Sequence, residues 1–171
     1  METRRITRTG MLTALALLLS YVEMLLPSFI PVPGIKLGLA NTAVVFALYT
    51  LPLADVLFIS VLRVFISSLL FGNVLSLVYS LAGAVLSLAV MALLYRLKLP
   101  LGAVSVTGGV VHNSAQLLVA SLVLSSTSIF YYLPFLIFSG AVTGFVIGLV
   151  AQALCDRLDE EYSFSQRGGI E

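Results

Sequence analysis

The sequence predicts an all-α integral membrane protein with six transmembrane helices and both termini in the cytoplasm. Of its 171 residues, 60% are hydrophobic and only 10% are charged, and the mean hydropathy is +1.11. Soluble domains carry about 25% charged residues. A membrane-spanning helix needs about 20 predominantly apolar residues, or somewhat fewer if its ends reach the interface. Six such stretches follow one another, at about 10–26, 37–51, 54–71, 73–95, 103–125 and 130–152.

The first stretch follows the basic segment METRRITRTG. This segment is similar to the charged region of a signal peptide, but no small-residue cleavage site precedes Pro27. We therefore expect an uncleaved first transmembrane helix. Gly10, Ala14 and Ala16 lie on or near one face of that helix. Small residues let such a face approach another helix closely, within the bundle or on a partner subunit.

The second and third stretches are short and are separated only by Leu51-Pro52-Leu53. They predict either two helices or one bent hairpin within the membrane. The fourth and sixth stretches carry small or polar residues at helical spacing, which predicts close packing between helices or, alternatively, docking to a separate protein. These residues are Asn73, Ser76, Ser80, Gly83 and Ser87 in the fourth stretch, and Gly140, Gly144 and Gly148 in the sixth.

The basic residues predict the orientation. They gather before the first stretch, between the fourth and fifth, and after the sixth, and the positive-inside rule assigns all three regions to the cytoplasm. Five or seven spans would break this parity. Residues 1–155 then form one transmembrane domain, and 156–171 form a charged cytoplasmic tail, partly disordered. The basic residues on which this assignment rests are Arg4, Arg5, Arg8, Arg96, Lys98 and Arg157.

Arg63 is the charged residue that falls in the middle of a predicted span. A charge at this depth costs a few kcal/mol and normally faces a cavity or a partner. Ser60 and Ser67 share its helix face. Arg63 is therefore either a ligand anchor or one half of a structural ion pair with Glu23.

A second polar cluster lies in the fifth stretch, where His112, Asn113 and Gln116 can face one groove. In apolar surroundings each needs a hydrogen-bond partner or a ligand. They are either bundle-core residues or part of a pocket. Arg63 is predicted at the same depth in the membrane as this cluster, and Asn41 and Asn73 enter from the outer face. Together these residues would form an outward-facing pocket with Lys36 at its mouth. Arginine binds carboxylates and phosphates bidentately, so this pocket predicts a small anionic or amphipathic solute.

Several chemistries lack their motifs in the sequence. It contains no G-x-x-x-x-G-K-[ST] phosphate loop, no aspartate pair for magnesium diphosphate chemistry and no H-E-x-x-H. A single histidine and a single cysteine, Cys155, predict no metal site and no cofactor. A net charge of +1 gives no indication of a nucleic-acid partner. The sequence favours binding and translocation over catalysis.

The run VPGIKLGLAN at 32–41, followed by an apolar helix and by Arg63-Val64-Phe65, resembles the Gx transporter family. That family is also labelled heptaprenyl diphosphate synthase component I, and it looks similar to the substrate-binding S components of energy-coupling factor (ECF) transporters. The resemblance covers roughly residues 8–155.

The resemblance implies an S-component-like six-helix bundle in the cell membrane, with the loop at 27–36 as a lid over an outward-facing pocket. It also implies a transmembrane coupling subunit and two ATPases as partners, docked on small residues of the first helix: Gly10, Ala14, Ala16 and Ser20. The alternative is a non-catalytic accessory subunit for polyprenyl diphosphate or quinone synthesis or membrane electron transfer. A stand-alone secondary transporter would favour carboxylates at mid-depth, which the predicted spans lack.

Overall fold

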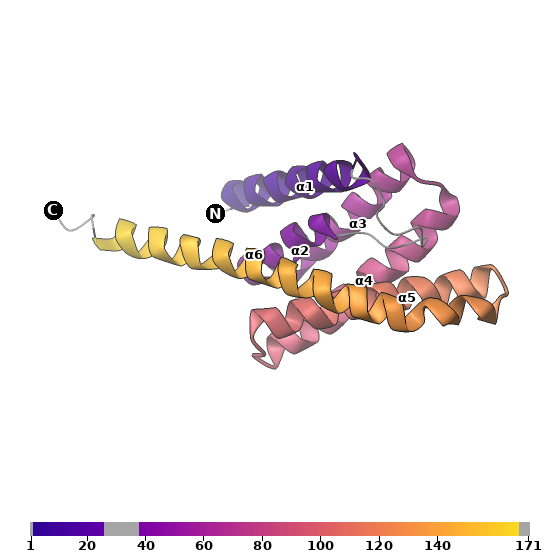
Figure 1. Ribbon diagram of the computed structural model, residues 1–171. Coiled ribbons are helices and arrows are strands. Elements are labelled where there is room, and N and C mark those ends of the chain that lie inside the picture. Colours follow the sequence, from indigo (N-terminus) through magenta and orange to yellow (C-terminus); the bar gives the residue numbers. More distant parts are fainter. Residues whose placement is uncertain (1, 26–37, 168–171) are drawn as a thin grey trace.

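The computed structural model describes residues 2–25 and 38–167, and this part of the chain is helical, with no strand. Six α-helices and one 3-10 helix follow one another (Figure 1). They are α1 (Glu2–Leu25), α2 (Leu39–Thr50), α3 (Leu53–Phe71), α4 (Val74–Arg96), α5 (Leu101–Val123), η1 (Thr127–Tyr132) and α6 (Leu133–Arg167).

The predicted all-α membrane architecture is confirmed. Five helices, α1 and α3 to α6, are long and apolar enough to cross a bilayer. The remaining α-helix, α2, has 12 residues and is therefore about 18 Å long. This length is well short of the roughly 30 Å hydrocarbon core of a bilayer. Pro52 caps the start of α3, so the second and third stretches form two separate helices. At the other end of the chain, α6 continues into the predicted tail as far as Arg167.

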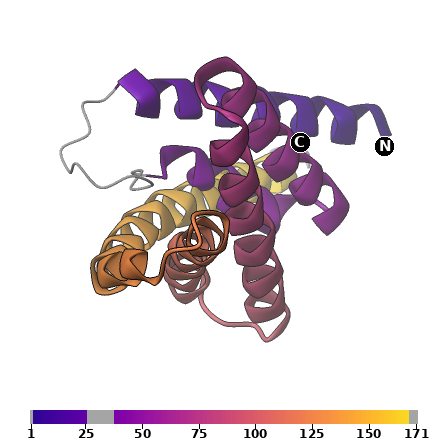
Figure 2. The same ribbon diagram turned by 90° about the vertical axis from the view of Figure 1, so that its right-hand side faces the viewer.

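Successive helices run in alternating directions. In Figure 1 both labelled termini and the α4–α5 turn lie on the left, and the α3–α4 and α5–α6 connections lie on the right. We call these the terminal end and the opposite end of the bundle. Figure 2 shows α5 nearly end-on and α6 at a slant, while α1 extends across the view, so α1 lies obliquely over the bundle. The short helix α2 is enclosed by α1, α3 and α6, and Ala40 and Ala47 on it are fully buried.

Helices α5 and α6 are in backbone contact along a line of glycines. A Cβ atom added to Gly144 would lie 2.7 Å from the carbonyl oxygen of Ser105 and 2.8 Å from Cα of Val106. One added to Gly140 would lie 2.7 Å from the carbonyl oxygen of Gly109. The predicted packing role of these glycines is confirmed.

Buried serines join the same helices by hydrogen bonds. Ser87 Oγ on α4 donates to the carbonyl oxygen of Gly108 at 2.8 Å, and Ser105 Oγ on α5 donates to that of Gly144 at 2.7 Å. Such bonds between membrane helices contribute about 0.6 to 2 kcal/mol each. They fix α5 between α4 and α6.

An ion pair at the terminal end joins α1 to α3. Arg5 Nη2 donates to Asp55 Oδ1 at 2.7 Å, and Arg5 Nε donates to Asp55 Oδ2. Because the Arg5 side chain is 51% exposed, water and salt screen the attraction. Arg5→Ala is expected to lower the stability by less than about 1 kcal/mol. Thermal unfolding followed by circular dichroism in detergent measures this change.

Two controls accompany the Arg5 measurement. Arg4→Ala changes an exposed arginine one position away on the same helix. Raising the salt concentration to about 1 M shortens the screening length to about 3 Å and should shrink the difference between Arg5→Ala and the unmodified protein. A salt-independent loss of several kcal/mol would show that the pair is a principal support of α1.

Candidate functional site

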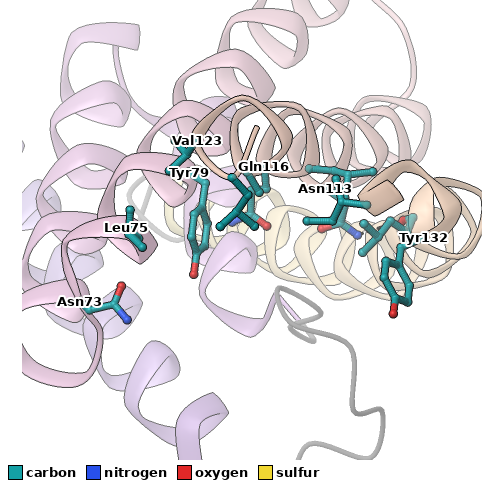
Figure 3. Close-up of a pocket in the computed structure, with 12 residues that line it drawn as sticks. Asn73, Leu75, Tyr79, Asn113, Gln116, Val123 and Tyr132 are labelled. Atoms are coloured by element: carbon teal, nitrogen blue, oxygen red, sulfur yellow. Dashed lines mark hydrogen bonds between the residues drawn. The ribbon is translucent and has the colours of Figure 1, made fainter. Parts of the chain in front are cut away.

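A cavity of about 350 Å³ lies at the opposite end of the bundle. Its walls come from the first turns of α4, the second half of α5, η1 and the start of α6 (Figure 3). The residues that line it are Asn73, Leu75, Tyr79, Asn113, Gln116, Leu117, Ala120, Val123, Leu124, Ile129, Tyr132 and Leu136. The lining is thus mainly apolar, with a few polar groups, as in sites for small molecules.

Asn113 and Gln116 are the deepest polar groups of the lining, and each is only 7% exposed. They lie three residues apart on α5, so they share one face of that helix. Asn113 Nδ2 donates to the carbonyl oxygen of Leu136 at 3.0 Å. Gln116 Nε2 is 3.5 Å from Ser80 Oγ on α4. Both amides are therefore held by neighbouring helices.

Asn73 stands at the mouth of the cavity as the N-cap of α4. Its Oδ1 accepts a hydrogen bond from the backbone N–H of Ser76 at 2.8 Å, which satisfies one of the free donors at the start of that helix. The side-chain NH₂ group is not used in this cap. Asn73 thus fixes the start of α4 and also contributes a polar group to the lining.

Arg63 belongs to a separate buried network. Its side chain is 9% exposed, and its Nη2 donates to Asn41 Oδ1 on α2 at 3.0 Å. Glu23 on α1 is close enough to attract Arg63, and its carboxylate also accepts the backbone N–H of Gly38. Gly38 caps α2 with φ 72°, a conformation that suits glycine. Three helices therefore meet around Arg63.

The structure places the predicted site residues in separate groups. It brings Asn73, Asn113 and Gln116 together in the cavity, and it brings Asn41 and Arg63 together in the network, which contributes no residue to the cavity lining. His112 is half-buried on α5, beside Gly83 of α4. Lys36 and the predicted lid at 27–36 lie outside the described residues.

The four predicted docking residues differ in how exposed they are. Gly10 and Ala14 are exposed on α1, whereas Ala16 is fully buried in the core. Ser20 is half-buried, and its hydroxyl donates to the carbonyl oxygen of Ala16. Only Gly10 and Ala14 therefore lie open to a partner helix in this arrangement.

Sequence reasoning missed Tyr79 and Tyr132 in the lining. A tyrosine near the end of a membrane helix usually belongs to the aromatic belt at the interface, so its position carried no separate signal. Within the part of the chain that the structure describes, no group of three His, Cys, Asp or Glu side chains could hold a metal ion. The arrangement is suited to holding a small molecule by apolar contact and a few hydrogen bonds.

Comparison with known proteins agrees with the resemblance noted in the sequence. The family model described as heptaprenyl diphosphate synthase component I matches residues 12–154. The chain matches no curated protein and no solved structure. The family match covers most of the chain, and its apolar helices are those of a multi-pass membrane protein. The protein therefore belongs to the heptaprenyl diphosphate synthase component I family.

Proposed function

We propose that the protein is the substrate-binding subunit of an importer of the energy-coupling factor type, and that it holds a small anionic or amphipathic solute in the cavity. The cavity beside Asn113 and Gln116 is the observation that carries this proposal. Its volume of about 350 Å³ lies within the range of roughly 300–1,000 Å³ typical of small-molecule sites.

The position of the cavity supports uptake from outside the cell. The basic residues in the first turns of α1, at the α4–α5 turn and within α6 lie towards the terminal end, and the positive-inside rule assigns that end to the cytoplasm. The cavity is at the opposite end, so it faces outward. A solute that enters there would still need a conformational change to reach the cytoplasm.

That change would require an energised partner, since no ATP-binding loop occurs in the chain. The exposed pair Gly10 and Ala14 on α1 offers a close-approach surface for a transmembrane coupling subunit, which would carry the ATPases. Membrane lipid covers the remaining apolar surface. Roles for Ala16 and Ser20 in docking, and for Lys36, Asn41, Arg63 and His112 in binding the solute, stay predictions.

A second candidate function follows from the family description. Its words, heptaprenyl diphosphate synthase component I, favour a non-catalytic membrane subunit that serves a prenyl diphosphate synthase. This candidate requires a stoichiometric protein partner and no transported solute. The two functions therefore predict different molecules bound to the purified protein: a small solute for the first and a synthase subunit for the second.

Native mass spectrometry of the protein purified from its own membrane distinguishes them. The protein is expected to retain a small molecule, and Ala120→Phe is expected to lower this occupancy at least about tenfold by filling the cavity. Leu118→Phe is the matched control, because Leu118 is 48% exposed on the same helix and is not among the lining residues. Retention of a synthase subunit with no small molecule would replace the first function by the second.

A further inference from the structure

We infer that the cavity selects a solute whose inserted end is uncharged and donates hydrogen bonds through N–H or O–H groups, in preference to a carboxylate or phosphate. This inference rests on the proposed function and narrows its ligand to the amphipathic, uncharged class.

The orientation of the Asn113 amide is the first argument. A backbone carbonyl can only accept, so the atom of Asn113 that lies 3.0 Å from the Leu136 carbonyl oxygen must be the NH₂ nitrogen. The same nitrogen lies 3.4 Å from Ser139 Oγ. The Asn113 carbonyl oxygen accepts no hydrogen bond from the described residues. It is therefore available as an acceptor for a ligand.

Gln116 lies one turn along α5. Its NH₂ group is 3.5 Å from Ser80 Oγ on α4, and in this arrangement its carbonyl oxygen accepts no bond from the part of the chain that the structure describes. The lining thus contains two amide oxygens that accept no hydrogen bond from the described residues. Each carries a partial negative charge, which attracts an N–H or O–H donor and repels an anionic oxygen.

The charge balance of the cavity is the second argument. None of the twelve described residues that line it is charged. An anion that is moved from water into an apolar site without a cation loses several kcal/mol of hydration. Arg63, which would neutralise an anion, is not among the lining residues and lies in its own network with Asn41 and Glu23. The described lining therefore supplies no cation to neutralise a negative group.

The remaining lining defines the body of the solute. The cavity is bordered by Leu75, Val123 and Leu124, which are 46–59% exposed. Its lining also includes the buried Leu117 and Leu136. Tyr79 and Tyr132 add aromatic rings from opposite walls (Figure 3). An apolar or aromatic body would bury its surface against these side chains, at about 25 cal/mol per Å².

A matched pair of probes tests the inference on the full-length protein in nanodiscs of uncharged lipid. The probes are 4-hexylbenzamide and 4-hexylbenzoate, which share a body and differ in the head: a neutral N–H donor or an anion. Binding is measured by calorimetry, with correction for partition into empty nanodiscs. The amide is expected to bind at least about tenfold more tightly, the equivalent of one good hydrogen bond or more.

Variants connect this preference to the cavity. Gln116→Met keeps the side-chain volume and removes an acceptor, so it should reduce the preference for the amide severalfold. Ala120→Phe should abolish binding of both probes, and Leu118→Phe should leave it unchanged. Equal or tighter binding of the benzoate, with loss in Ala120→Phe, would overturn the inference and leave the proposed function standing. Failure of both probes to bind, or binding that Ala120→Phe does not affect, would count against the cavity as a solute site and thus against both.

Discussion

Gly144→Ala is expected to destabilise the protein by about 2–4 kcal/mol, although the change adds a single methyl group. The added carbon would lie 2.7 Å from the Ser105 carbonyl oxygen and 2.8 Å from Cα of Val106. Real Cβ atoms essentially never show such distances, and here the obstacle is the backbone of α5, which no side-chain rotation relieves. Helices α5 and α6 must therefore separate, and the bond from Ser105 Oγ to the Gly144 carbonyl weakens.

The matched control for this substitution is Gly10→Ala. A Cβ atom at Gly10 meets nothing within 4 Å, so alanine should raise the stability by about 0.5–1 kcal/mol through its better helix propensity. The same chemical change thus has opposite expected signs at two glycines. Unfolding by sodium dodecyl sulfate, followed by circular dichroism, gives both values; the chain contains no tryptophan to report by fluorescence. Equal shifts for the two variants would contradict the close approach of α5 and α6.

Arg63→Met is expected to cost about 3 kcal/mol, the second large effect. Removing one partner of a buried polar network leaves the others without their counterpart. Asn41 Oδ1 would lose its donor and Glu23 would lose the cation that attracts it. The same unfolding measurement applies.

A double-mutant cycle separates this network from simple loss of packing. Glu23→Gln keeps an oxygen that accepts the Gly38 N–H and removes the negative charge. Combined with Arg63→Met, it should cost at least 1 kcal/mol less than the sum of the two single changes, because the two charges are then removed together. Strict additivity would mean that Glu23 and Arg63 stabilise the bundle independently, and Arg63 would regain its place as a candidate ligand anchor.

Much of the fold was predictable because turn residues and charges bound the apolar stretches. Pro52, Asn73 and Pro100 cap the starts of α3, α4 and α5, and the predicted spans agree with these helices to within a few residues. The beginning of the last span was less accurate. Residues 127–132 form η1, and α6 begins at Leu133, one residue before a proline that suits a first helical turn.

The site was only partly predictable, because hydropathy gives the depth of a residue but not the direction in which its helix faces. Asn113 and Gln116 were grouped correctly, since residues three apart on one helix share a face. Arg63 was predicted at the same depth as Asn113. However, the packing of α3 directs it to α1 and α2, and that packing depends on contacts between helices far apart in the sequence. The two clusters therefore belong to different parts of the molecule.

The network around Arg63 also has a consequence for how the chain is made. Asn41 and Glu23, the groups that stabilise Arg63, both precede it in the sequence. Synthesis proceeds from the N-terminus. When α3 leaves the translocation machinery, α1 and α2 have already emerged, so the arginine can enter lipid with its partners present and need not wait for α4 to α6. Because both partners precede Arg63 in the sequence, its charge can be paired as soon as α3 enters the membrane.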